Sequence, residues 1–297
     1  MVENINYSYR DLSKLIDAVT EKYPFIRRFS IGKSCLNKDI TALRIGRAKN
    51  CMLFAAGIHG SEHITTNIIM YFLCELASAL FTDSRIGSVR VTKALKDCGV
   101  IIVPMVNPDG CDIAINGISY AGRFSELVRK TSKGNTAHWN ANARGVDINH
   151  NFSAGFKEVK ALERKSGILS AGPTRFGGNY PESEPETAAL CALCRNINIR
   201  HAVALHTQGE VIYWNYGNHN PRSSEQMAQI MATASGYSLD VPEGIAYGAG
   251  FKDWFIEEFN RPAFTVEAGL GENPLDIKTA HEIYERLKSM LTLCAIM

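Results

Sequence analysis

The stretch Leu53-Phe-Ala-Ala-Gly-Ile-His-Gly-Ser-Glu-His-Ile-Thr-Thr66 passes from a short apolar run into a segment with helical spacing. The apolar run predicts a buried strand that ends near His59, and Glu62 follows at the head of the predicted helix. An imidazole and a carboxylate placed together where a strand gives way to a helix supply half of the ligands of a zinc site. We therefore expect this segment both to begin a strand-to-helix unit and to contribute to a metal centre.

The same letters also spell His-x-x-Glu-His, in which His59 and His63 would both bind the metal and Glu62 would be the base. That motif needs a continuous helix, so that residues four apart share one face. Gly60 and the preceding strand argue against such a helix. The preferred interpretation takes His59 and Glu62 as ligands, leaves His63 aside, and requires a distant third histidine, with water in the fourth position. A turn with chance polar residues is the alternative without a metal.

Composition excludes several classes of function. With 297 residues, of which 45% are hydrophobic and 21% charged, the chain has the make-up of an ordinary soluble globular protein. A net charge of +2 favours neither a nucleic acid nor an anionic membrane as partner. Apolar runs such as residues 100–106 are too short to span a membrane.

The N-terminal residues lack the basic start and apolar core of a secretory signal. Most of the eight cysteines fall within predicted strands and helices. Cys191 and Cys194 lie on a helical run, where we interpret them as small core residues rather than a redox pair. Buried thiols of this kind suit a cytoplasmic enzyme.

Strands alternate with helices along most of the chain. Strands are predicted over 26–31, 40–45, 53–58, 100–106, 202–206 and 263–266, and helices over about 12–19, 62–80, 186–196, 224–235, 252–259 and 280–295. From about 111 to 185 the patterning nearly vanishes, which indicates a long active-site loop region. We expect a single α/β domain, with a mixed, mostly parallel sheet flanked by helices on both faces.

Two further polar residues end predicted strands. His206 closes the run Ala202-Val-Ala-Leu-His206, and Glu267 closes Ala263-Phe-Thr-Val-Glu267. Ligand sites in α/β sheets lie at the carboxyl ends of strands, so His206 is the natural third ligand beside His59. Glu267 is a candidate general base, and its alternative role is a structural partner for a nearby cation.

Through these residues the chain resembles the zinc carboxypeptidases of the carboxypeptidase A type, from about residue 9 to the C-terminus. In this resemblance His59, Glu62 and His206 match the ligands of one zinc ion, and Glu267 matches the catalytic glutamate. Arg129 falls where the family places an arginine that polarises the scissile carbonyl. The implied reaction is hydrolysis by metal-activated water, whose pKa zinc lowers toward ~7, with Glu267 taking the proton.

Departures from the family pattern concern the substrate. The family's Asn-Arg pair, which grips a terminal carboxylate, is Asn149-His150 here, and histidine is not a permanent bidentate cation. Lys252 stands where the family sets preference for the leaving residue, which suggests a leaving residue with a second carboxylate; a solvated helix lysine is the alternative. Tyr247 is the best match for the tyrosine that closes over the substrate, although it requires a gap.

These departures resemble the bacterial branch of the family that cuts γ-D-glutamyl–diaminopimelate bonds in peptidoglycan stem peptides. We therefore expect a zinc metallopeptidase with a peptide substrate and an acidic leaving residue, and no nucleic-acid or membrane partner. The alternatives are a general carboxypeptidase that releases C-terminal residues and an amidohydrolase of N-acyl amino acids. The non-enzymatic alternative is a binding protein with a vestigial site.

Overall fold

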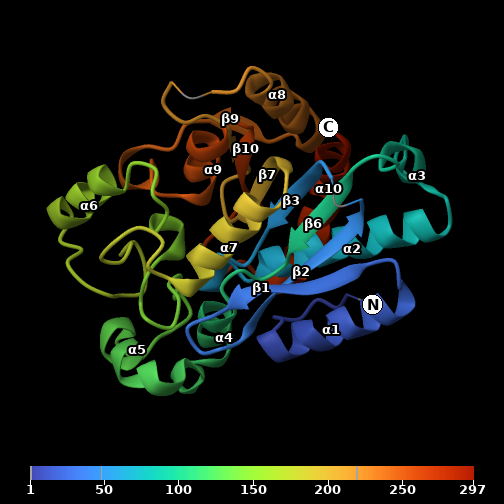
Figure 1. Ribbon diagram of the computed structural model, residues 1–297. Coiled ribbons are helices and arrows are strands. Elements are labelled where there is room, and N and C mark those ends of the chain that lie inside the picture. The colour runs from blue at the N-terminus through green and yellow to red at the C-terminus, as the bar shows by residue number, and fades with distance from the viewer. Residues whose placement is uncertain (1, 48, 219) are drawn as a thin grey trace.

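A computed structural model describes residues 2–47, 49–218 and 220–297 of the chain (Figure 1). The helices are α1 (Tyr9–Lys22), α2 (Ile64–Phe81), α3 (Val91–Ala94), α4 (Pro108–Asn116), α5 (Ser125–Ser132), α6 (Phe156–Lys165), α7 (Pro185–Asn196), α8 (Ser224–Ser235), α9 (Phe251–Phe259) and α10 (Ala280–Ile296). The strands are β1 (Arg27–Lys33), β2 (Asp39–Gly46), β3 (Cys51–Ala55), β4 (Arg85–Ile86), β5 (Val89–Arg90), β6 (Gly99–Val103), β7 (Ile199–His206), β8 (Val211–Tyr213), β9 (Ser238–Asp240) and β10 (Ala263–Glu267). Short 3-10 helices include η1 (Gly60–Glu62), η3 (Ile148–His150) and η4 (Gly244–Ala246).

Eight of the strands form one mixed sheet in the order β1-β2-β6-β3-β7-β10-β8-β9. The central strands β6, β3, β7 and β10 are parallel neighbours, and β8 pairs in parallel with β9. The hairpin of β1 with β2, and the pairs β2 with β6 and β10 with β8, are antiparallel. The predicted mixed, mostly parallel sheet is confirmed.

Helices cover both faces of this sheet, and the side chains of β3 point alternately into the two cores that result. Met52 and Phe54 join the core formed with α1, α2, α8 and α10. Cys51, Leu53 and Ala55 face the other core, with α7 and α9. A strand buried on both faces reads as a continuous apolar run, as this one does in the sequence. Cys191 and Cys194 are buried in the second core, in agreement with the interpretation as core residues.

Residues 111–185 differ from the expected long loop. The region contains the end of α4 and the helices α5 and α6, and the predicted patternless stretch is wrong to that extent. Both α5 and α6 are short, and α5 buries only Val128. α5 has only two apolar residues, the neighbours Leu127 and Val128, which are too few to produce a helical period, so tertiary contacts decide its formation. In α6 the apolar residues Phe156, Val159 and Leu162 do recur with helical spacing, and the sequence analysis overlooked this pattern.

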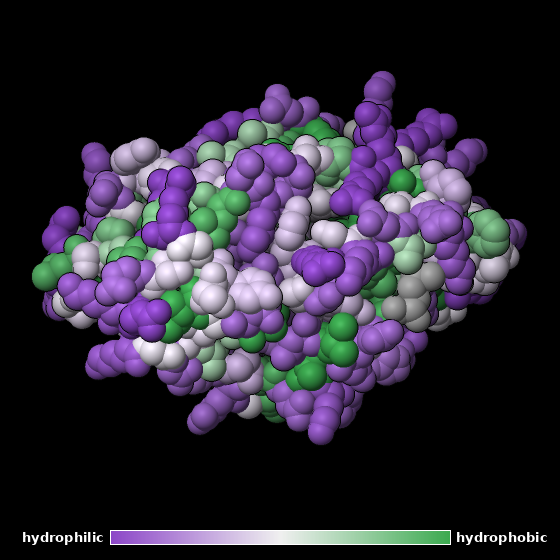
Figure 2. All heavy atoms as spheres, turned by 90° about the horizontal axis from the view of Figure 1, so that it is seen from below, coloured by the Kyte–Doolittle hydropathy of each residue, from purple (hydrophilic) through white to green (hydrophobic). Residues whose placement is uncertain are grey.

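The surface and α2 bear on membrane contact. Figure 2 shows mostly hydrophilic residues on the face seen from below, with hydrophobic residues in small separate groups. Within the described residues, α2 alone is long and apolar enough to cross a membrane, and 67% of it is buried inside the protein. Its apolar residues pack in the core between the sheet and α10, which accounts for its composition.

Candidate active site

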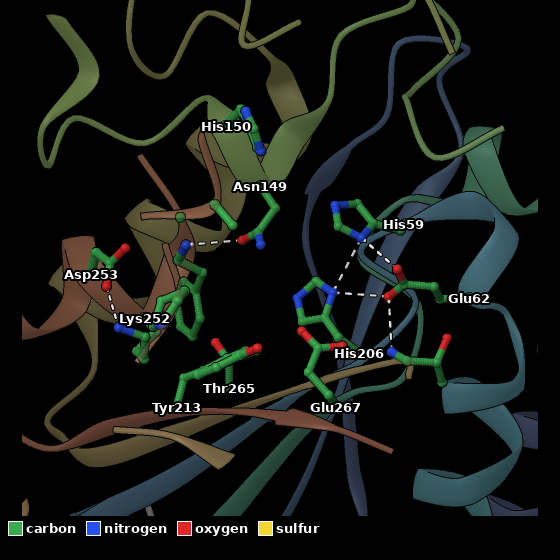
Figure 3. A pocket seen from close by; sticks show the side chains of 15 residues that line it. His59, Glu62, Asn149, His150, His206, Tyr213, Lys252, Asp253, Thr265 and Glu267 are labelled. Carbon is green, nitrogen blue, oxygen red and sulfur yellow. Dashed lines mark hydrogen bonds and ion pairs between the residues drawn. The ribbon is translucent and has the colours of Figure 1, made fainter. Parts of the chain in front are cut away.

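The three predicted metal ligands converge at the carboxyl end of the sheet (Figure 3). β3 and β7 are adjacent and parallel, so His59, just beyond β3, lies beside His206, the last residue of β7. Glu62 reaches the same point from η1. Its two oxygens lie 2.9 Å from Nδ1 of His59 and 2.9 Å from Nδ1 of His206, and the two Nδ1 atoms are 3.2 Å apart. Backbone topology therefore assembles residues that are 147 positions apart in sequence.

This donor set fits zinc. Two imidazole nitrogens and a carboxylate are ligands of catalytic zinc, and bonds of 2.0–2.1 Å in a tetrahedron put ligand atoms about 3.3 Å apart. The observed separations of 2.9–3.2 Å are close to that spacing. Burial raises the pKa of Glu62, but His59 and His206 outweigh burial and lower that pKa to about 2. Glu62 is thus ionised at neutral pH, as a ligand must be.

His63, the second histidine of the opening stretch, lies outside this group. The backbone forms a 3-10 turn over Gly60–Glu62 and only then enters α2, so the residues of the alternative motif do not share one continuous α-helix. A Cβ on Gly60 would lie 2.4 Å from the carbonyl oxygens of Gly110 and Trp139. Only glycine fits so close an approach. His63 is buried, and burial lowers its pKa to about 4.

Asp147 is a residue of the site that the sequence analysis missed. Its Oδ1 lies 3.0 Å from Nε2 of His59, and its Oδ2 accepts a 2.8 Å hydrogen bond from the backbone N–H of Arg175. Burial raises the pKa of Asp147, but His59 and His150 outweigh burial and hold that pKa well below its usual range. A metal-binding histidine usually pairs its other nitrogen with a carboxylate or carbonyl. The sequence feature that could have pointed to Asp147 is its position, as an acidic residue two positions before Asn149.

Glu267 lies next to His206 because β10 and β7 are parallel and these two residues are register partners. Burial, followed by repulsion from Glu62, raises the pKa of Glu267 to about 8. A carboxylate with so raised a pKa accepts a proton near neutral pH and can pass it on, as a general base and acid must. Glu267 thus lies next to the metal ligands, and its role as general base stays a prediction.

A cavity of about 150 Å³ opens beside these residues. Its lining includes His59, Glu62, Asn149, His150, His206, Thr207, Tyr213, Lys252, Asp253, Thr265 and Glu267. Three of the four predicted substrate-binding residues, Asn149, His150 and Lys252, therefore line the cavity that contains the metal ligands. Tyr213, Asp253 and Thr265 are further lining residues that the sequence analysis did not single out.

Asn149 and His150 enter the cavity from η3. The side-chain oxygen of Asn149 accepts a 3.0 Å hydrogen bond from the backbone N–H of Phe251, so its amide orientation is set. His150 is buried, and its Nδ1 has no hydrogen-bond partner within the described part of the chain. Burial lowers the pKa of His150. His150 is therefore neutral at pH 7 and offers a neutral hydrogen-bonding group where the family pattern has a cation.

Two predicted residues are not brought to the cavity. Arg129 lies on α5 with 63% of its side chain exposed and pairs loosely with Glu126, 3.8 Å away. The neighbouring Val128 is the buried position of α5, and this orientation turns Arg129 toward solvent. The structure therefore does not support the role in polarising the carbonyl.

Tyr247 also lies outside the cavity lining, although the neighbouring Ala246 belongs to it. The Tyr247 hydroxyl accepts a 2.6 Å hydrogen bond from the backbone N–H of Gly217. Its ring packs against that of Tyr216, with the centroids 5.4 Å apart. These contacts direct Tyr247 toward residues 216–217 rather than toward the metal ligands.

Comparisons with known proteins agree with this geometry. A sequence model of the family described as zinc carboxypeptidase matches residues 12–285. The chain is 36% identical over 282 residues to gamma-D-glutamyl-L-diamino acid endopeptidase 1 of Lysinibacillus sphaericus, covering 94% of this chain and 70% of the relative.

Solved structures support the fold. Bovine thrombin-activatable fibrinolysis inhibitor, in complex with tick carboxypeptidase inhibitor, has a TM-score of 0.73 at 20% identity, covering 98% of this chain and 97% of the other. The murein-tripeptide amidase of Escherichia coli O157 has a TM-score of 0.55 at 23% identity, covering 90% and 91%. With the family match over nearly its whole length and a site that fits zinc, the chain belongs to the zinc carboxypeptidase family and is a zinc metallopeptidase.

Proposed function

We propose that this enzyme hydrolyses the bond between γ-D-glutamate and diaminopimelate in peptidoglycan stem peptides. The similarity to the Lysinibacillus sphaericus endopeptidase carries the proposal, because that relative is named for a γ-D-glutamyl–diamino acid bond and aligns with 94% of this chain. The charged lining of the cavity supports it, since Lys252 places an ammonium group in the wall.

The residues of the cavity divide the chemistry between them. His59, Glu62 and His206 would hold zinc, which when bound polarises the scissile carbonyl and makes water a nucleophile near neutral pH. Glu267 takes the proton of the attacking water and returns it to the leaving amine. Asp147 holds the imidazole of His59 in one tautomer, with its Nδ1 directed at the ligand group.

Lys252 and His150 are the residues that we assign to the leaving group. The side chain of Lys252 is 4% exposed, so an anion that reaches it meets a cation shielded from bulk water. Neutral His150 grips a main-chain carboxylate less firmly than an arginine would. A weaker grip at this position suits an enzyme that also accepts a leaving group longer than one residue.

A general carboxypeptidase is the second candidate, and Asn149 favours it. This residue lines the cavity and belongs to the pair that grips a terminal carboxylate in the resemblance described above. Human carboxypeptidase B is 26% identical to this chain over 266 residues. On either reading the substrate is a peptide and the chemistry at Glu267 is the same.

We also propose a cytoplasmic location. Six of the eight cysteines are buried, and Cys191 and Cys194 lie in the core between α7 and the sheet. A chain rich in buried thiols suits a reducing compartment.

A paired substrate assay tests the proposed function. The zinc-loaded enzyme is incubated with a muropeptide tri- or tetrapeptide that contains diaminopimelate, and separately with a benzoylated peptide that ends in phenylalanine. Release of the diaminopimelate-containing fragment is expected, with little release of phenylalanine. Fast release of phenylalanine, with the muropeptide intact, would show a carboxypeptidase instead. Glu267→Gln is the negative control for both substrates.

A further inference from the structure

Two opposite charges lie side by side in the cavity wall, on the side away from the metal ligands. Lys252 and Asp253 both belong to the first turn of α9, both line the cavity, and both are buried. Figure 3 shows them on one side of the cavity, with His59 and Glu62 on the other. Tyr213 and Thr265 lie between the two groups in that view.

We propose that Lys252 and Asp253 act together as a receptor for a zwitterion, namely the amino-acid group at the far end of the leaving residue's side chain. Lys252 would bind its carboxylate and Asp253 its ammonium group. This inference rests on the proposed function and extends it, because it specifies which diamino acid the cavity selects.

The hydrogen bonds of the pair leave capacity for such a ligand. Of the three ammonium donors of Lys252, the described part of the chain uses two, one with Asp253 Oδ1 and one with the carbonyl oxygen of Asn215, 2.6 Å away. Asp253 Oδ2 accepts a 2.9 Å hydrogen bond from the N–H of Gly248. A carboxylate offers about four acceptor positions, so one donor and two acceptor positions remain on the pair.

Charge balance points to a ligand with both signs. A lone carboxylate drawn to Lys252 would meet the negative charge of Asp253, and a lone ammonium drawn to Asp253 would meet Lys252. Both charges are shielded from water, so each repulsion acts at low effective dielectric. An ammonium and a carboxylate carried by one carbon atom satisfy both partners and leave no buried charge uncompensated.

The position of the pair fits the far end of a side chain. Thr265 and Glu267 are two residues apart on β10, so their side chains project from the same face of the sheet about 7 Å apart. Both line the cavity, which thus extends along the strand from the catalytic carboxylate past Thr265. A leaving residue bound at Glu267 can direct its side chain along this path toward Lys252 and Asp253.

Three peptides that differ only in the leaving residue distinguish a receptor for a zwitterion from one for a single charge. Meso-diaminopimelate ends in an ammonium and a carboxylate on one carbon. L-lysine lacks the distal carboxylate, and L-2-aminopimelate lacks the distal amine. All three are coupled to γ-D-glutamate in otherwise identical L-alanyl-γ-D-glutamyl peptides, and kcat/KM is measured with the zinc-loaded wild-type enzyme.

The kcat/KM of the diaminopimelate peptide is expected to exceed that of each of the other two by about 10- to 100-fold, because an analogue that lacks one charged group leaves its buried partner on the enzyme unsatisfied. Equal cleavage of all three peptides would overturn the zwitterion receptor and leave the γ-D-glutamyl specificity standing. A failure to cut any of the three, with release of a C-terminal phenylalanine, would instead reject the proposed function itself.

Variants assign the two halves of the receptor. Lys252→Met is expected to bring the diaminopimelate-to-lysine ratio close to one, and Asp253→Asn to bring the diaminopimelate-to-aminopimelate ratio close to one. Lys252→Arg keeps the charge and should keep most of the first ratio. Unchanged ratios in folded Lys252→Met and Asp253→Asn would overturn the assignment.

Lys38→Met is the matched control, since Lys38 forms a partly buried ion pair with Asp112, 2.7 Å away, and does not line the cavity. Lys38→Met should lower stability and leave both substrate ratios unchanged. Thermal unfolding of every variant establishes that it folds, and the wild-type comparison of three substrates decides the proposal even where a variant does not.

Discussion

Asp147 binds the side of the His59 ring that is turned away from the other metal ligands, with its Oδ1 3.0 Å from Nε2. Nδ1 of the same ring faces Glu62 and His206. The carboxylate therefore sets the direction of the ring and keeps a proton on Nε2, so that Nδ1 is the nitrogen available to the metal. Such partners raise the basicity of a ligand and reduce the orientational freedom that binding must remove.

Asp147→Asn is expected to weaken zinc binding about 10- to 100-fold. The amide keeps the shape and loses the charge that favours a protonated Nε2. Competition against a chromogenic chelator measures the affinity, and circular dichroism shows whether the fold is intact. Unchanged zinc affinity in a folded variant would remove Asp147 from this role.

Glu267→Gln is expected to lower kcat by about 10²- to 10⁴-fold, the usual contribution of a general acid–base. The zinc content should stay at one ion per chain, because Glu267 does not belong to the ligand group. Metal analysis together with kcat separates the two effects. A variant that retains full activity would show that another residue moves the proton.

Arg129→Ala is expected to leave kcat and KM unchanged, because its side chain is mostly exposed and does not belong to the lining of the cavity. The loss of its loose contact with Glu126 should change the free energy of unfolding by less than about 0.5 kcal/mol. Steady-state kinetics on the muropeptide decide the matter. A large fall in kcat would mean that α5 moves to the cavity when substrate binds.

Removal of zinc by a chelator is expected to abolish hydrolysis and to lower the melting temperature. A ligand that binds only the folded state stabilises it by about 4 kcal/mol when its free concentration is a thousand times Kd. Differential scanning calorimetry at several zinc concentrations measures this shift. Added zinc should restore both properties, whereas Mg²⁺ should not, because histidine-rich sites do not suit it.

His201 gives the fold a defined acid sensitivity. It is buried at 2.7 Å from the carbonyl oxygen of Cys294, and burial lowers its pKa from 6.5 to about 4. Between these two pH values the unfolded chain binds the proton and the folded chain does not. Stability therefore falls as the pH is lowered from about 6.5 to 4, by about 3 kcal/mol from this residue.

His201→Gln removes the titrating group and keeps a donor for the Cys294 carbonyl. Urea unfolding from pH 7 to pH 4 should therefore show a shallower loss of stability in this variant than in the wild type. Parallel pH profiles for the two proteins would contradict the assignment.

Much of the architecture could be predicted from local pattern. The strand predicted over 53–58 is observed over Cys51–Ala55, and the helix predicted over about 62–80 is observed over Ile64–Phe81. Both lie in apolar runs that can be recognised in the sequence without knowledge of their neighbours. The short helix α5 was missed because it buries few residues and depends on what packs against it, whereas α6 has apolar residues at helical spacing that the sequence analysis overlooked. Strands β8 and β9 have three residues each, too few for a periodic signal.

The residues of the candidate site likewise fall into those that the sequence could predict and those that only the structure revealed. The sequence by itself determined His59, Glu62, His206 and Glu267 as candidates, because each ends or follows a recognisable strand and parallel strands end at one edge. Only the tertiary structure decided that Arg129 faces solvent, that Tyr247 bonds to Gly217, and that Asp147 and Asp253 reach the site. These residues lie in loops and in the terminal turns of short helices, where side-chain direction depends on packing between segments distant in sequence rather than on any local period.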